Sequence, residues 1–220
     1  MLLDLGNGAL GALQHYIGLY DVDAVLLSHL HADHCLDLCS YFVARTYHPQ
    51  GAFPAIPVYG PAGTADHMAR AYGLELQPGM RNCFDFRVLM DGVHDIGPFR
   101  VTAARMNHPV EAYGVRVEHG GRVLTYSGDT GETSTLSELA RDADMLLCEA
   151  SFQEGMQVPV DMHLTGRQAA EHAHRAGARQ LVLTHLVPWY DETRTLDDAH
   201  TSGYVGDVEL ARAGARYELA

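Results

Sequence analysis

The chain has 220 residues, 47% of them apolar, which is enough for one sizeable hydrophobic core, so we predict a single domain over residues 1–220. Its 15 Lys and Arg against 28 Asp and Glu give a formal net charge of −13, which disfavours long nucleic acids as partners. The four cysteines form no CxxC pair and no apolar run reaches the roughly 18 residues of a membrane span. We therefore expect reduced thiols, a cytoplasmic location and no membrane partner.

Strand-like and helix-like patterns alternate along the chain, as is typical of an α/β protein in one piece. In chain order they predict strands at 1–6 and 23–28, a helix ending before His48, a strand at 56–61, a helix at 63–73, strands at 87–90, 99–106, 113–120 and 122–128, a helix at 135–143, a strand at 144–151, a helix at 165–177, and strands at 180–185 and 215–219. Gly120 and Gly121 predict a hairpin turn between two of these strands.

Polar side chains that bind metals follow the predicted strands. They are His29 and His31 after 23–28, His108 after 99–106, Asp129 after 122–128, Glu149 in 144–151 and His185 at the end of 180–185. Strand ends that meet at one edge of a sheet are where α/β enzymes build their sites. Neutral imidazoles and carboxylates suit Zn²⁺ or a similar divalent ion, so the pattern predicts a metal site.

The same residues carry a family resemblance. The segment HLHADH (29–34) resembles the HxHxDH signature of the metallo-β-lactamase superfamily, and His108, SGDTG (127–131) and TH (184–185) follow in that family's order. The resemblance implies an αβ/βα sandwich of two mixed β-sheets flanked by helices. Because the family's usual opening strands precede the LLDLG segment with which this chain begins, we expect those first strands to be lacking.

The resemblance also implies a ligand set. It assigns one metal ion to His29, His31 and His108, a second to Asp33, His34 and His185, and a bridging position to Asp129. Two divalent ions are expected, with zinc as the first choice and manganese or iron also compatible with such mixed donors.

Two further segments narrow the branch. CEAS, which contains Glu149, and HLT, which contains His163, resemble the ribonuclease Z-like phosphodiesterases, and DxHLTG at 161–166 resembles bacterial cyclic-nucleotide phosphodiesterases of the atypical class II type. The resemblance implies hydrolysis of a small phosphodiester or nucleotide by a metal-bridging hydroxide. His163 would be the general acid, Glu149 would support it, and Asp33 would also relay protons. A homodimer is compatible with the resemblance.

Other functions remain open. A ribonuclease Z activity is one, although the arm that grips tRNA is commonly inserted between the third histidine and the bridging aspartate, and here His108 and Asp129 are only 21 positions apart. A thioester or lactam hydrolase is another, although di-zinc β-lactamases usually place cysteine where this chain has Asp129. A non-catalytic scaffold would have lost ligands, and here none is lost.

Several residues also have a purely structural interpretation. His163 could be a capping or structural histidine before a helix that starts near Thr165, and Glu149 could be a buried carboxylate that binds loop amides. Trp189 and Tyr190 could stack on a base near the metals or could simply pack.

Overall fold

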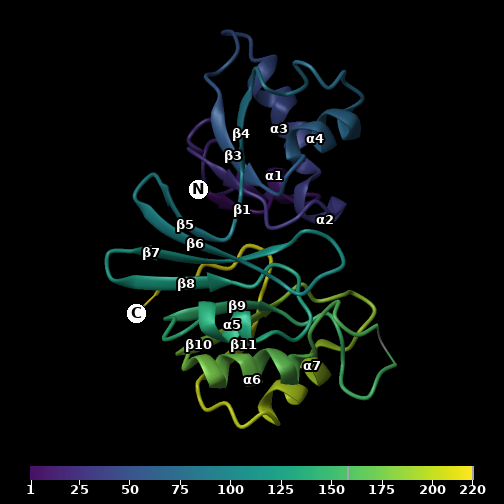
Figure 1. The fold of residues 1–220 in the computed structure, drawn as a ribbon, viewed down its shortest axis with the longest axis vertical. Coiled ribbons are helices and arrows are strands. Elements are labelled where there is room, and N and C mark those ends of the chain that lie inside the picture. Colours follow the sequence, from purple (N-terminus) through teal and green to yellow (C-terminus); the bar gives the residue numbers. More distant parts are fainter. Residues whose placement is uncertain (158, 220) are drawn as a thin grey trace. The chain divides into compact units, whose positions relative to one another are not determined.

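The computed structural model describes residues 1–157 and 159–219. The chain forms two compact units, Met1–Met90 (unit 1) and Asp91–Ala220 (unit 2), each with its own sheet (Figure 1). Compact units are not the same as independently folding domains, so the single domain over 1–220 stays a prediction. Among the described residues, no helix has the length and apolar character needed to cross a membrane.

Unit 1 is a four-stranded parallel sheet in the order β1-β2-β3-β4. Its strands are β1 (Leu2–Leu3), β2 (Val25–Leu26), β3 (Ile56–Gly60) and β4 (Phe84–Val88), and its helices are α1 (Ala9–Leu13), α2 (Ala32–Cys35), α3 (Asp37–Thr46) and α4 (Thr64–Tyr72). The helix predicted at 63–73 is confirmed, because Gly73 adopts the left-handed conformation that ends α4.

One hydrophobic core joins the helices and strands of unit 1. Leu38 and Tyr41 of α3 and Met68 of α4 are buried in the same cluster as Val25, Val58 and Phe84 of the sheet. Burying each large apolar side chain contributes about 1.5–3 kcal/mol relative to its exposure. This packing holds the ends of β1 and β2 in place.

Unit 2 is a seven-stranded mixed sheet in the order β11-β10-β9-β8-β7-β6-β5. Its strands are β5 (Gly92–Ile96), β6 (Phe99–Arg105), β7 (Tyr113–His119), β8 (Arg122–Tyr126), β9 (Met145–Glu149), β10 (Gln180–Thr184) and β11 (Asp207–Leu210). Strands β5 to β8 are antiparallel neighbours and β8 to β11 are parallel neighbours. It follows that β6, β8, β9 and β10 all run in one direction, and their carboxyl ends reach the same edge.

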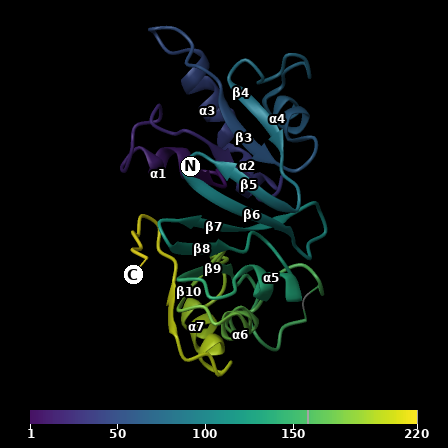
Figure 2. The same ribbon diagram turned by 60° about the vertical axis from the view of Figure 1, so that its left-hand side comes forward.

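Three helices cover unit 2: α5 (Ser134–Leu139), α6 (Gly166–Ala176) and α7 (Glu192–His200). Helices α6 and α7 lie side by side in both views (Figure 1 and Figure 2). The buried face of α6 carries Ala169, Ala170 and Ala173, whose small side chains let the helix approach β9 and β10 closely. Thr165 and Gln168 form a capping box at the start of α6. The helix predicted at 165–177 is confirmed.

The predicted α/β class with two sheets flanked by helices is confirmed, although the smaller sheet, expected to be mixed, is parallel throughout. The hairpin at Gly120 and Gly121 is also confirmed, since both have positive φ angles and His119 pairs with Arg122. The closing strand predicted at 215–219 is wrong, because the last strand is β11. The strand predicted at 87–90 starts three residues after the start of β4, and no prediction covers β5, β11, α1 or α7.

Unit 2 contains a buried histidine whose charge state predicts a pH dependence of stability. His172 on α6 is 1% exposed; its Nδ1 lies 2.8 Å from Ser137 Oγ and 3.1 Å from Arg175 Nη2, and its Nε2 has no hydrogen-bond partner among the described residues. Burial, with a smaller contribution from the positive charge of Arg175, lowers the pKa of His172 to about 4.

Because an unfolded histidine has a pKa near 6.5, unfolding takes up a proton between about pH 6.5 and 4, and stability falls as the pH falls through this window. Between pH 7.5 and 5, we expect the free energy of unfolding of the wild type to fall by about 2 kcal/mol more than that of His172→Gln. Urea titrations of both proteins at the two pH values, with chelator present, measure the difference. Equal losses in the two proteins would contradict the assignment.

Candidate metal centre

In unit 1, the candidate site residues lie at or beyond the carboxyl ends of β1 and β2. Asp4 follows β1, and Ser28 and His29 follow its parallel neighbour β2. The loop after His29 leads into α2, whose short turn carries Asp33 and His34. We call His29, His31, Asp33 and His34 the first half-site.

Donor atoms of the first half-site approach one another closely. His29 Nε2 lies 3.0 Å from His31 Nδ1, and the ring centroids of His29 and His34 are 4.1 Å apart. Two nitrogens that bind one tetrahedral zinc at about 2.0–2.1 Å would lie roughly 3.3 Å apart, so the His29 and His31 nitrogens are spaced as ligands of one ion. Asp33 Oδ2 lies 3.5 Å from His34 Nε2, which gives a second pair of adjacent donors.

Asp4 orients this half-site. Its carboxylate accepts hydrogen bonds from the Ser28 amide at 2.6 Å, the Ser28 hydroxyl at 2.7 Å and His34 Nδ1 at 2.7 Å. Since the Ser28 hydroxyl donates its proton to Asp4, its oxygen is left to accept from His29 Nδ1, 3.0 Å away. Asp4 therefore fixes one histidine directly and a second through Ser28.

This role of Asp4 is not among the residues predicted from the sequence. The LLDLG segment predicts a short buried strand, and Asp4 is the residue where that strand ends, with a left-handed φ of 57°. The signal in the sequence that could have indicated this role is a lone aspartate between apolar neighbours at the end of a predicted strand.

Unit 2 carries the remaining candidates at one edge of its sheet. His108 follows β6, Asp129 follows β8, and His185 follows β10. We call His108, Asp129 and His185 the second half-site. Asp129 Oδ1 lies 3.6 Å from His185 Nδ1, and Asp129 Oδ2 lies 3.9 Å from His163 Nδ1. Four side chains of unit 2 each offer one donor atom that lies within 4.8 Å of the other three: Asp129, Glu149, His163 and His185. The convergence predicted for the ends of these strands is therefore observed within unit 2.

The histidines of the second half-site are also held through Nδ1. His108 Nδ1 donates to the Met162 carbonyl at 2.9 Å. His185 Nδ1 lies 2.5 Å from Ser151 Oγ, whose hydroxyl also donates to the His185 carbonyl at 2.9 Å. Ser151 belongs to the CEAS segment, in which no local pattern indicates a role for this serine.

These partners define the tautomers. Carboxylate and carbonyl oxygens can only accept, so the protons of His34 and His108 are placed on Nδ1, and the serine contacts place those of His29 and His185 there too. In all four rings Nε2 is then the nitrogen that can bind a cation, as in metal sites where the other ring nitrogen donates to a supporting group.

Glu149 is the buried centre of unit 2. It has no exposed surface, and its Oε1 accepts from the Thr130 amide at 2.7 Å and from His163 Nδ1 at 2.9 Å. Its Oε2 accepts from the Leu164 amide at 3.2 Å. Burial raises the pKa of Glu149, while its bond to His163 opposes that shift. Glu149 therefore binds loop amides, as the structural interpretation expects, and it also contacts His163, while its catalytic role stays a prediction.

His163 lies between the two histidines of the second half-site. Its ring centroid is 5.4 Å from that of His108 and 5.2 Å from that of His185. The capping interpretation of His163 is wrong, because Thr165 supplies the side-chain cap of α6. With Nδ1 bound to Glu149, the other ring nitrogen of His163 is Nε2.

Histidines and carboxylates that cluster beyond the strand ends of a two-sheet α/β fold indicate a site for divalent metal ions. The model of the β-lactamase superfamily domain matches residues 2–186, and the chain belongs to this family as a metallo-hydrolase.

The chain is 40% identical to the uncharacterized protein Rv1339 of Mycobacterium tuberculosis, over 100% of this chain and 81% of that one. It is 29% identical to ribonuclease Z of Myxococcus xanthus, over 100% of this chain and 88% of that protein. The crystal structure of the metallo-β-lactamase fold protein YhfI from Bacillus subtilis is similar with a TM-score of 0.86 and 25% identity, covering 98% of this chain and 86% of that one. The superfamily resemblance and the likeness to ribonuclease Z are confirmed.

The family implies divalent metal ions, and the residues present fit them. The fit rests on three features of the donor set. Imidazole rings are held by hydrogen bonds through Nδ1, one nitrogen of His29 and one of His31 are spaced as ligands of one ion, and the Asp129 carboxylate is buried.

Removing the charge of Asp4 should weaken metal binding while leaving the fold intact. Asn tolerates the left-handed φ of this position, but Asp4→Asn replaces one accepting oxygen with a donor that faces His34 Nδ1 or Ser28. We expect metal affinity to fall about ten- to a hundredfold.

Competition with a chromophoric chelator measures this affinity, and thermal unfolding of the metal-free proteins checks the fold. Asp23→Asn is the matched control, because Asp23 is an exposed carboxylate on the same segment as β2. Equal affinities of the two variants would exclude a supporting role for Asp4.

Proposed function

We propose that the protein is a binuclear metal-dependent phosphodiesterase that acts on cyclic nucleotides or other small phosphodiesters. One ion would be held by His29, His31 and His108, the second by Asp33, His34 and His185, with Asp129 bridging. When bound, such ions lower the pKa of a water ligand towards about 7 and polarise phosphoryl oxygens.

The observation that carries this proposal is the Glu149–His163 pair beside the second half-site. A ribose oxygen departs as a poor leaving group unless it is protonated, whereas a thiolate, with a pKa near 8.5, leaves without an acid. A histidine held 2.9 Å from a buried carboxylate therefore favours a phosphodiester over a thioester. The carboxylate stabilises the protonated ring and directs Nε2 towards the substrate.

The proposed step balances as a hydrolysis. The water oxygen binds phosphorus, the bond from phosphorus to the departing ribose oxygen breaks, and the proton from His163 Nε2 ends on that oxygen. Asp33, an exposed carboxylate beside His34, is assigned the second role of accepting the proton that the water loses.

The substrate is proposed to be small. Between His108 and Asp129 the chain forms the β7–β8 hairpin, so this stretch holds a compact turn where ribonuclease Z commonly inserts its arm. The net charge of −13 also disfavours a long polyanion. Ribonuclease Z activity is the second candidate, favoured by the similarity to the Myxococcus protein. The proposal includes a cytoplasmic location, which the four free cysteines support, and a homodimer as an expectation from the resemblance.

Two substrates separate the roles of Asp129 and His163. With 3′,5′-cyclic AMP, we expect His163→Ala to lower kcat/KM by about 10²–10⁴-fold, because the ribose oxygen needs an acid. With bis(p-nitrophenyl) phosphate the loss should be much smaller, because p-nitrophenolate is a stable anion. Asp129→Ala should abolish both activities and lower the metal content, whereas His163→Ala should retain its metal.

His174→Ala is the matched control, since His174 is an exposed histidine on α6. Equal losses of His163→Ala on both substrates would remove the acid role. If the folded, metal-loaded wild type cleaves neither substrate, the phosphodiesterase proposal is wrong, and thioesters and lactams are the next substrates to test.

A further inference from the structure

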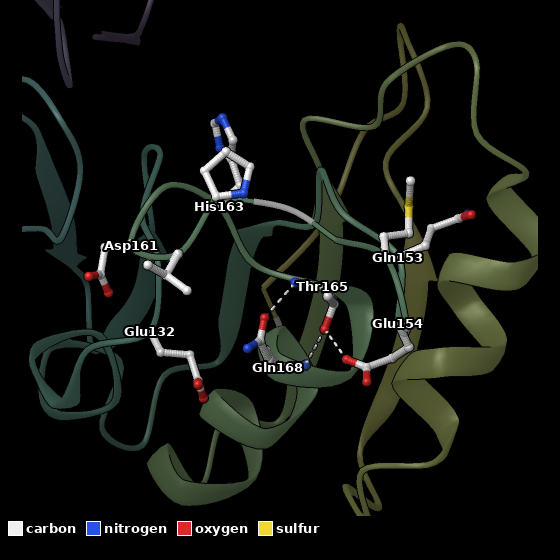
Figure 3. A pocket seen from close by; sticks show the side chains of 11 residues that line it. Glu132, Gln153, Glu154, Asp161, His163, Thr165 and Gln168 are labelled. Atoms are coloured by element: carbon white, nitrogen blue, oxygen red, sulfur yellow. Dashed lines mark hydrogen bonds between the residues drawn. The ribbon is translucent and has the colours of Figure 1, made fainter.

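A pocket of about 300 Å³ lies beside His163 and is formed within unit 2 (Figure 3). Its walls come from the segment after β9, from Glu132 beyond the Asp129 loop, and from the first turn of α6. His163 lies at one end of this pocket, so a group seated in it is adjacent to the proposed proton donor. The volume is at the lower limit of small-molecule sites and suits one nucleoside rather than several.

The charged side chains that line the pocket are acidic. Glu132, Glu154 and Asp161 line it, and the described residues of its lining include neither Lys nor Arg. Two of these carboxylates have fixed partners: Glu154 Oε1 accepts from Thr165 Oγ1 at 2.6 Å, and Asp161 Oδ1 accepts from Asn107 Nδ2 at 2.8 Å.

The third carboxylate, that of Glu132, is exposed and makes no hydrogen bond or ion pair within the described part of the chain. A second phosphate seated beside Glu132, at the part of the pocket away from His163, would be repelled by this carboxylate.

The remaining lining suits a neutral, hydroxyl-bearing ligand with an apolar face. Met156 and Val160 supply apolar surface, and the carboxylates accept hydrogen bonds from hydroxyl or amino groups. Gln168 uses its amide oxygen for the Thr165 backbone, which leaves its amide nitrogen as a donor. A nucleoside has this combination of a flat ring, hydroxyls and ring acceptors.

We propose that this pocket binds the nucleoside that carries the departing oxygen, and that Glu132 selects against a leaving nucleoside bearing a second phosphate. The inference rests on the proposed function, because His163 is the group that protonates the departing oxygen. It narrows the substrate to diesters in which the nucleoside with the departing oxygen carries no phosphate besides the one that is cleaved, as in a cyclic nucleotide or ApA. It disfavours an internal linkage of an RNA chain, where that nucleoside carries a further phosphate.

The test compares two dinucleotides that differ only at the leaving nucleoside. Cleavage of the bond to the 3′ oxygen releases adenosine from ApA and adenosine 5′-monophosphate from pApA. We expect metal-loaded wild type to favour ApA over pApA in kcat/KM by about tenfold or more. We expect Glu132→Gln to reduce this ratio about threefold and Glu132→Lys to reduce it about tenfold, since charge repulsion is weakened and then reversed. If the products show that the 5′ oxygen leaves instead, ApAp replaces pApA.

Glu138→Gln and Glu138→Lys make the same changes of net charge on the exposed surface of α5, away from this pocket, and should leave the ratio unchanged. A ratio that is the same in wild type and both Glu132 variants, or that changes equally in the Glu138 variants, would overturn the assignment.

A binding measurement separates failure of this inference from failure of the proposed function. Adenosine and adenosine 5′-monophosphate are titrated into the full chain with chelator present, and binding is followed by NMR. Tighter binding of adenosine, with the preference lost in Glu132→Lys, supports the pocket even if no diester is cleaved. Equal binding of the two ligands, or none, overturns it even if bis(p-nitrophenyl) phosphate is hydrolysed.

Discussion

The site in unit 2 depends on one buried carboxylate. A fully buried Glu149 would be costly as an isolated charge, so it persists because backbone amides of Thr130 and Leu164 and the ring of His163 surround it. Each of these donors lies next to a residue of the proposed site: Thr130 follows Asp129, and Leu164 follows His163. The hydrogen bonds to the carboxylate thereby fix the distance between the segments that carry Asp129 and His163, and a change in either loop would leave the buried carboxylate with too few donors.

Unit 1 uses the same device at a smaller scale. Asp4 lies where β1 ends, and its oxygens collect the Ser28 amide, the Ser28 hydroxyl and His34 Nδ1. The amide of Leu5 donates to the His34 carbonyl, and Gly6 approaches so closely that a Cβ there would lie 1.6 Å from the Asp33 carbonyl oxygen. The short LLDLG segment therefore positions both the backbone of α2 and the ring of His34. A strand of two residues is sufficient for this task.

Much of the arrangement could be predicted because it is local in sequence. HLHADH follows an apolar strand, Thr165 and Gln168 are separated by the capping-box spacing, and Gly120-Gly121 fits a hairpin, so each pattern contains its own physical cause. The roles of Asp4 and Ser151 depend on strand pairings with distant segments, and nothing near them in the sequence shows which neighbour they face. Strand β5 and helix α7 were missed because their outward faces are polar, whereas the strand predicted at 215–219 has an alternating pattern without a neighbour to pair with among the described strands.

The segment that walls the pocket begins and ends at two residues that lie side by side, Phe152 after β9 and Thr165 before α6. Phe152 pairs with Thr165, and the Phe152 amide donates to the Leu164 carbonyl at 3.0 Å. A loop closed at its base in this way can gain, lose or exchange residues at its tip with only a small cost in chain entropy, while His163 at the closure stays where it is. Substitutions in this loop would therefore change the shape of the pocket beside His163 without moving the histidine itself.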